Sequence, residues 1–167
     1  MHSILRILIK GDQVLAKAEA GALILMISVM TVVIFLQIVF RYAFVRPLHW
    51  SEESARYLFV WLSVVGAALG VQKGGHFGLD FFNRMLSGKG RRWINLGIHL
   101  LMGIVVLVIL IQGIILVQKT SLQESPAMAI SMSWAYASIP VAAGLMAVHL
   151  LTVLLKEAMA DDQNKKT

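Results

Sequence analysis

The chain alternates between long uncharged, apolar runs and short polar segments. A helix that crosses a bilayer needs about 20 predominantly apolar residues. Uncharged runs of this kind cover residues 20–40, 57–72, 93–118 and 125–155. The second run is the shortest, and it can span the membrane only if its helix begins near Ser51 and carries polar residues at its outer edge. The pattern therefore predicts an all-α integral membrane protein with four transmembrane helices.

We expect one membrane domain over residues 1–167, with boundaries set by the polar segments. The four spans should cover residues 20–42, 51–72, 93–118 and 128–155. Pro140 should kink the last span or mark a broken start, because proline cannot donate a helix hydrogen bond. Residues 156–167 should form a polar tail.

Two further helices should lie along the membrane surface. Residues 1–18 space their polar side chains along one helix face, as in a basic amphipathic helix on an anionic surface. These side chains are Arg6, Lys10, Gln13 and Lys17. The alternative is a frayed terminus. Residues 76–87 repeat Phe77, Phe81, Phe82, Met85 and Leu86 at helical spacing, which predicts a short interfacial helix.

Composition and charge support a membrane protein and set its orientation. Hydrophobic residues make up 58% of the chain and charged residues 14%, with a mean hydropathy of +0.76; soluble domains carry roughly 25% charged residues. The net charge of +6 does not indicate nucleic acid, because eleven of the fifteen lysines and arginines fall on one side of the four-span arrangement. Positive loops stay in the cytoplasm. We therefore expect both termini on the cytoplasmic side of the membrane.

Charged residues gather where the first two spans approach the outer surface. Glu52 and Arg56 are four residues apart and can pair on one helix face, with Arg41 and Arg46 on the same side of the membrane. Two interpretations stay open. The charges form an internal cluster that ties the first two spans together, or they form a docking site for another subunit.

A stripe of small residues follows helical spacing in the second span. It consists of Ser63, Gly66, Ala67 and Gly70. Small side chains let helix backbones approach closely. We expect packing inside this bundle, with packing against a different protein as the alternative.

Histidines give a second function class to test. His99 and His149 should lie at similar depth, and two facing histidines can bind a b-type haem. The alternative is that each forms ordinary hydrogen bonds. His76 and Asp80, four apart, should form a local pair.

The chain has no cysteine, no phosphate loop and no Ser/His/Asp arrangement. We therefore expect neither an enzyme nor a resident cofactor.

Short motifs along nearly the whole chain resemble the small permease, or DctQ-like, family of tripartite ATP-independent periplasmic (TRAP) transporters. They are Arg41-Tyr42, Trp50-Ser51-Glu52-Glu53 followed by Arg56, Gly66-Ala67, Gly75-His76 followed by Asp80, Trp134-Ala135-Tyr136 and Ile139-Pro140. The Arg-Tyr pair ends the family's first span, and the Glu-Glu segment opens its second.

The resemblance implies a role that composition does not show. In this family a large permease subunit carries out sodium-driven transport, and a periplasmic binding protein delivers the solute, usually a carboxylate such as a C4-dicarboxylate or sialic acid. The small subunit resembles a fixed scaffold that is embedded in membrane lipid and holds the large subunit in the membrane. On this interpretation the surface that orders the two subunits consists of Arg41, Trp50, Glu52, Glu53, Arg56 and Trp61. A haem-binding membrane anchor of a redox enzyme and a self-assembling exporter are the competing hypotheses.

Overall fold

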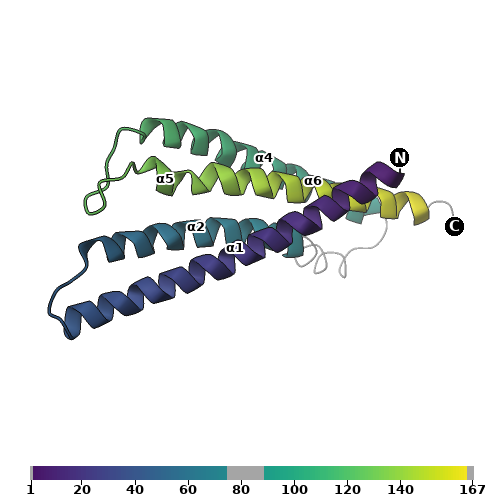
Figure 1. Cartoon of the computed structure of the whole chain (residues 1–167). Helices are drawn as coiled ribbons and strands as arrows, with labels where there is room; N and C mark the ends of the chain where they lie inside the picture. Colours follow the sequence, from purple (N-terminus) through teal and green to yellow (C-terminus); the bar gives the residue numbers. More distant parts are fainter. Residues whose placement is uncertain (1, 75–88, 165–167) are drawn as a thin grey trace.

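The computed structural model describes residues 2–74 and 89–164 of the chain (Figure 1). The helices are α1 (His2–Tyr42), α2 (His49–Gly74), α4 (Lys89–Lys119), α5 (Ser133–Tyr136) and α6 (Ser138–Asn164). Four stretches are long and apolar enough to cross a membrane: Ile7–Tyr42, His49–Lys73, Gly97–Lys119 and Ser133–Lys156. These observations confirm the prediction of an all-α protein with four potential spans.

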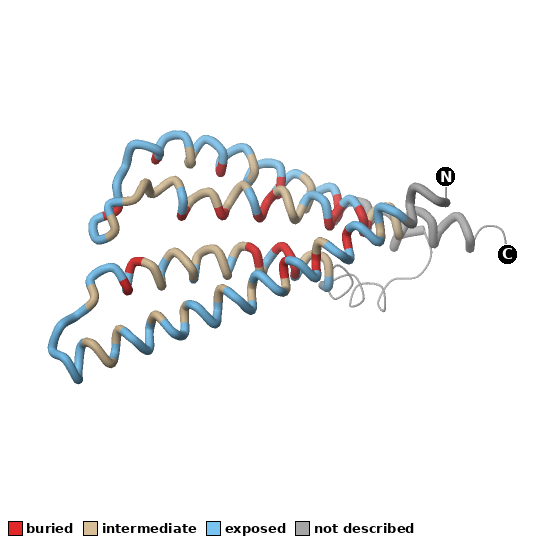
Figure 2. The backbone as a smooth tube through the Cα atoms, in the orientation of Figure 1, coloured by how far each residue is buried: buried red, intermediate tan, exposed pale blue. Residues whose placement is uncertain are grey.

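The four long helices pack side by side in the order α1, α2, α6, α4. α2 contacts α1 along one side and α6 along the other, and α4 packs on the far side of α6 (Figure 1). The two termini lie at the same end of the molecule, where α1 crosses α6 (Figure 1). The two central helices, α2 and α6, carry more buried residues than the two outer helices, α1 and α4 (Figure 2). No residue is buried in the most apolar window of α1, whereas 39% of the corresponding α6 window is buried.

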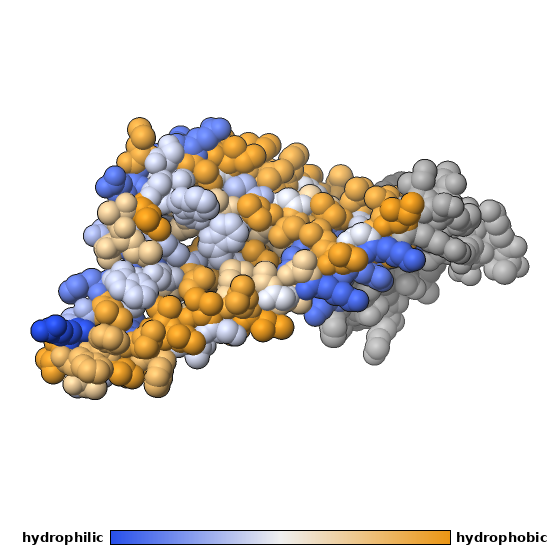
Figure 3. All heavy atoms as spheres, in the orientation of Figure 1, coloured by the Kyte–Doolittle hydropathy of each residue, from blue (hydrophilic) through white to orange (hydrophobic). Residues whose placement is uncertain are grey.

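Small side chains form much of the contact region in the two central helices. Ala68 of α2 and Ala143 of α6 are completely buried, and Ala142 is nearly so. In lipid, apolar side chains gain little by leaving their surroundings, so close backbone approach through small residues favours helix association. The outer faces remain apolar, and hydrophilic side chains on the face shown in Figure 3 gather towards the ends of the helices.

The first helix differs from the sequence prediction. An interfacial helix over residues 1–18 and a separate span over 20–42 were expected, but α1 runs without a break from His2 to Tyr42. Its early turns carry Asp12, Ala16 and Glu19 on a buried face, which packs into the protein. The expected polar face, with Lys10 and Lys17, is exposed. Whether the first turns of α1 lie at the membrane surface stays a prediction.

The last span has the broken start that Pro140 predicted. Residues 128–132, expected inside the span, belong to the loop that precedes α5. Pro140 is the third residue of α6, and an early helix position tolerates a residue without an N–H group. The Ser138 hydroxyl donates to the carbonyl of Ala135 at 2.7 Å across the junction between α5 and α6.

At its other end, α6 continues to Asn164, past the expected tail boundary at residue 156. The expected interfacial helix over residues 76–87 lies outside the described residues.

Gly113 sets the distance between α4 and the start of α6. It is buried, and a Cβ atom there would lie 3.0 Å from the ring nitrogen and Cδ of Pro140 and 3.0 Å from Cγ2 of Ile139. We predict that Gly113→Ala forces the helices apart and costs about 1–3 kcal/mol of stability, as overpacking does elsewhere. Thermal unfolding in detergent measures the change.

Gly97 provides a matched control on the same helix. A Cβ atom there meets nothing within 4 Å. Gly97→Ala should therefore keep stability or raise it by about 0.5–1 kcal/mol through helix propensity. Equal melting temperatures for the two alanine variants would contradict the prediction.

Candidate functional site

Glu53 joins the start of α2 to the loop between α4 and α5. Its side chain is buried although it lies in the second turn of α2. One carboxylate oxygen accepts from the hydroxyl of Tyr57, one turn along the helix. The other accepts the backbone N–H groups of Ala127 and Met128, at 2.8 and 3.1 Å. Hydrogen bonds to an ionised acceptor are stronger than neutral ones, so Glu53 holds this loop against α2.

The loop that Glu53 binds is closed by hydrogen bonds of its own. The N–H of Ser125 donates to the carbonyl of Ile130 at 2.8 Å, and the N–H of Met132 donates to that of Gln123 at 2.8 Å. Ala129 adopts the left-handed backbone conformation, with a φ of 52°. These contacts close a tight turn that presents two adjacent N–H groups to the carboxylate. Glu53 therefore acts as an anchor for local structure.

The other residues expected at the subunit surface divide into two groups. Glu52 and Arg56 are exposed and pair with each other at 3.4 Å along one helix face. Arg41 is exposed beside the ring of Tyr42, and Trp50 is 43% exposed.

Trp61 instead makes an internal contact, because its indole N–H donates to the carbonyl of Trp134 at 3.0 Å.

No ion pair joins α1 to α2 among the described residues, so the internal-cluster interpretation, in which these charges tie the first two spans together, is not supported.

The small-residue stripe of α2 faces mainly outward. Ser63, Ala67 and Gly70 are exposed, whereas Gly66 is half-buried and its Cβ position lies 4.0 Å from Cδ2 of Leu23 on α1. The Ser63 hydroxyl is satisfied within the helix by the carbonyl of Phe59, at 2.7 Å. Packing inside the bundle was expected. Gly66 lies against α1, but the buried residues in this part of α2 are Val65, Ala68 and Leu69. The stripe is therefore available to another helix.

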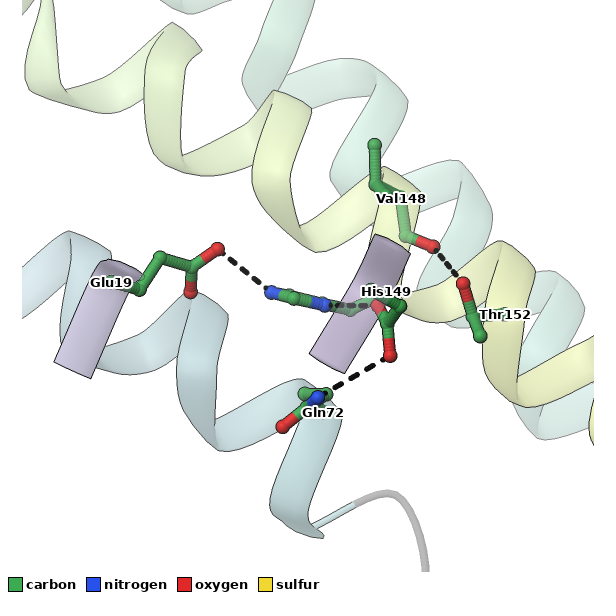
Figure 4. A network of polar contacts seen from close by, with 6 residues as sticks. Glu19, Gln72, Val148, His149 and Thr152 are labelled. Carbon is green, nitrogen blue, oxygen red and sulfur yellow. Dashed lines mark hydrogen bonds and ion pairs between the residues drawn. The ribbon is translucent and has the colours of Figure 1, made fainter. Parts of the chain in front are cut away.

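A second polar cluster lies at the end where the termini meet. His149 of α6 is fully buried and extends between two carboxylates of α1 (Figure 4). Its Nδ1 lies 2.6 Å from Oδ1 of Asp12, and its Nε2 lies 2.9 Å from Oε1 of Glu19. The second oxygen of Asp12 accepts from the amide of Gln72 on α2, at 3.3 Å. The cluster thus joins α1, α2 and α6.

Sequence reasoning missed Asp12 and Glu19 as partners of His149. The regular spacing of basic residues in the first segment drew attention to its exposed face. The available signal was the spacing of the acids: residues seven apart lie on one helix face, two turns from each other. An imidazole ring can bridge two carboxylates at that separation. The partner in α6 could not be read from the sequence, because 130 residues separate Glu19 from His149.

The structure also bears on the haem hypothesis. A histidine ligates iron through an unprotonated ring nitrogen. Both ring nitrogens of His149 are in contact with carboxylates, so neither is available to a metal. The expected pair of His76 and Asp80 lies outside the described residues.

Replacing Glu53 should release the loop between α4 and α5. We predict that Glu53→Ala exposes the amides of Ala127 and Met128, which lose their acceptor, and speeds their hydrogen exchange by several-fold. Glu52→Ala is the matched control, because Glu52 is its neighbour but is exposed and pairs with Arg56 instead of with the loop. Equal exchange in the two variants would show that Glu53 does not hold the loop.

Comparison with known proteins identifies the family. Residues 30–159 match the family described as tripartite ATP-independent periplasmic transporters, DctQ component. This match covers both the Glu53 anchor and His149.

Individual relatives agree with the family match. The chain is 33% identical over 114 residues to the sialic acid TRAP transporter permease protein SiaT of Haemophilus influenzae, which covers 68% of this chain and 18% of that protein. It is 30% identical over 115 residues to the sialic acid TRAP transporter small permease protein SiaQ of Vibrio cholerae, covering 69% of this chain and 66% of that one. It is 34% identical over 108 residues to the C4-dicarboxylate TRAP transporter small permease protein DctQ of Rhodobacter capsulatus, covering 62% and 47%.

The aligned region therefore spans less than two thirds of each of these relatives. A match over residues 30–159 nevertheless takes in most of this chain and its spans, and it shows that the chain belongs to the DctQ component family of the tripartite ATP-independent periplasmic transporters.

Proposed function

We propose that this chain is the small membrane subunit of a TRAP transporter, an accessory component that holds a large permease subunit in the bacterial inner membrane. Two of the relatives carry the name small permease protein. In SiaT, the matching stretch is 18% of a longer permease protein. We infer that the remainder of such a longer protein corresponds to the partner that this chain would meet as a separate subunit.

The observation that carries the proposal is the outward-facing small-residue stripe of α2. Ser63, Ala67 and Gly70 are exposed although residues of this size favour close contact between helices in a membrane. Close to the outer end of the same helix, Glu52 and Arg56 are also exposed. The stripe supplies a surface for tight packing, and the charges can fix the position of the partner along it.

The arrangement of the helices supports the same function. Since α1 has no buried residue in its most apolar window, that helix is open to lipid or to a partner on most of its surface. A helix layer of this kind can act as a scaffold beside a larger membrane protein. The excess of lysine and arginine on one side supports an orientation with both termini in the cytoplasm.

We propose that the assembled transporter takes up a carboxylate-bearing solute with sodium. The relatives are named for sialic acid and for C4-dicarboxylates, both of which carry carboxylate groups. The solute would be delivered by a periplasmic binding protein and carried by the large subunit. The haem-anchor alternative is not favoured, because both ring nitrogens of His149 are in contact with carboxylates.

Enlarging the stripe tests the proposed subunit surface. Gly70→Leu adds a side chain where a Cβ atom meets nothing within 4 Å of this chain, so the fold should tolerate it. We predict that less of the large permease subunit co-purifies in mild detergent, because the leucine blocks close approach of its helix. Quantitative mass spectrometry of the purified complex measures the ratio of the subunits.

Gly21→Leu is the control for this experiment. Gly21 lies on the exposed surface of α1, and its Cβ position also meets nothing within 4 Å. The control should keep the wild-type subunit ratio. Wild-type assembly in Gly70→Leu, or loss of the partner only in Gly21→Leu, would place the interface elsewhere.

Reconstitution tests the proposed transport. Vesicles that contain this chain and the large permease subunit, supplied with the binding protein, should take up sialic acid or a C4-dicarboxylate when sodium is higher outside. Uptake should fall to background when sodium is replaced by potassium or when this chain is omitted. Transport by this chain alone would instead support the exporter hypothesis.

A further inference from the structure

The two contacts of His149 need one more hydrogen than the three groups carry in their ordinary forms at neutral pH. Both of its ring nitrogens face a carboxylate oxygen at hydrogen-bond distance, 2.6 Å to Asp12 and 2.9 Å to Glu19. A neutral imidazole carries one N–H donor, and an ionised carboxylate only accepts. With all three groups in their ordinary neutral-pH forms, one of the two contacts would therefore bring two lone pairs together without a hydrogen. Each contact needs its own hydrogen.

Two arrangements provide the second hydrogen. Either the ring is an imidazolium that donates to two ionised carboxylates, or the ring is neutral and one carboxyl group is protonated and donates to it. Both arrangements contain the same number of protons and leave a single net negative charge. The geometry thus fixes the proton count of the cluster without fixing the position of each hydrogen.

The surroundings of the two acids differ. Asp12 is satisfied at both oxygens, by His149 and by the amide of Gln72. Glu19 has one oxygen, Oε2, that is buried and has no hydrogen-bond partner. A buried ionised oxygen without a donor is costly, whereas a neutral carbonyl oxygen is less so. The remaining negative charge is therefore better placed on Asp12, and the added proton on the Glu19 side of the ring.

We propose that Asp12, His149 and Glu19 form a buried proton-binding site, with the exchangeable proton held between Nε2 of His149 and Oε1 of Glu19. This assignment does not depend on the transport function proposed above. When the proton leaves to water, it leaves a neutral ring and two ionised carboxylates, so the net charge of the cluster changes from one negative charge to two. The Nε2–Oε1 contact then loses its hydrogen.

Each helix packed around the cluster carries polar or charged groups. α1 contributes the two acids, and its Lys10 and Lys17 are exposed. α2 contributes the uncharged Gln72 and the exposed Lys73. On α6, the Thr152 hydroxyl donates to the carbonyl of Val148, away from the ring (Figure 4).

The nearest titratable residue on the described part of α4 that is buried is His99, and it has an interaction partner. Within the described part of the chain, no lysine or arginine pairs with either acid of the cluster.

Proton binding should control how firmly α1 holds α6. The two helices meet over a short stretch that contains this cluster, whereas α1 packs along α2 for much of its length (Figure 1). The folded cluster holds one proton more than the same three groups hold when they are apart in their ordinary neutral-pH forms. Stability then falls as pH rises, because the folded state binds the additional proton.

Thermal unfolding of the full chain in detergent, from about pH 6 to about pH 9, tests the site. The melting temperature of the wild type should fall across this range. In Glu19→Gln the side-chain amide donates to Nε2 without needing the added proton, so the fall should be largely lost. Glu52→Gln, which changes an exposed acid, should keep the wild-type dependence. A flat wild-type curve, or the same slope in Glu19→Gln, would overturn the proposal.

A spectroscopic measurement on the wild type covers the case in which Glu19→Gln does not fold. Histidine-selective ¹⁵N NMR near pH 8 reports which ring nitrogens of His149 carry a proton. The signal of His149 is assigned by replacing the other four histidines one at a time. Infrared spectroscopy reports protonated carboxyl groups. An imidazolium, or a neutral ring together with a protonated carboxyl group, supports the site. A neutral ring with no protonated carboxyl group contradicts it.

Discussion

A carboxylate buried between helices must receive hydrogen bonds, and in this protein that requirement determines which segments meet. In lipid, apolar side chains have little preference for each other over their surroundings, so they position helices only loosely. Buried polar contacts are directional and costly to leave unmade. Glu53 receives donors from its own helix and from a distant loop, and His149 bridges two acids of α1. The two clusters tie the helices together near opposite ends of the layer.

Polar clusters that join the helices near both ends of the layer, with apolar side chains between them, suit a scaffold. The polar clusters are buried between the helices, so the outer faces of α1 and α2 remain available to lipid or to a partner helix. On the outer face of α2 the one hydroxyl of the small-residue stripe, that of Ser63, is satisfied within its own helix, so the stripe can accept a close neighbour. Membership of the DctQ component family gives this surface a partner to be tested, the large permease subunit.

The charged outer segment shows how one sequence motif can contain two different roles. Glu52 and Glu53 are adjacent and chemically identical, so the sequence treats them alike. In the structure Glu52 is exposed and pairs with Arg56, whereas Glu53 points inward and binds the N–H groups of Ala127 and Met128. Neighbouring helix residues point about 100° apart. Which of the two directions is inward depends on where the other helices pack.

The sequence by itself determined the helical class, the four spans and the break at Pro140, because these depend on local hydrophobicity, on length and on a missing N–H group. Its motifs also indicated the family that the comparisons then identified. Only the tertiary structure decided that α1 is one continuous helix, that the small stripe of α2 faces outward, and that Asp12 and Glu19 bind His149. Each of these depends on which faces of separate helices meet. That pairing joins residues from 60 positions apart, as in Gln72 and Asp12, to 137 positions apart, as in His149 and Asp12, and the periodicity of a single helix contains no information about it.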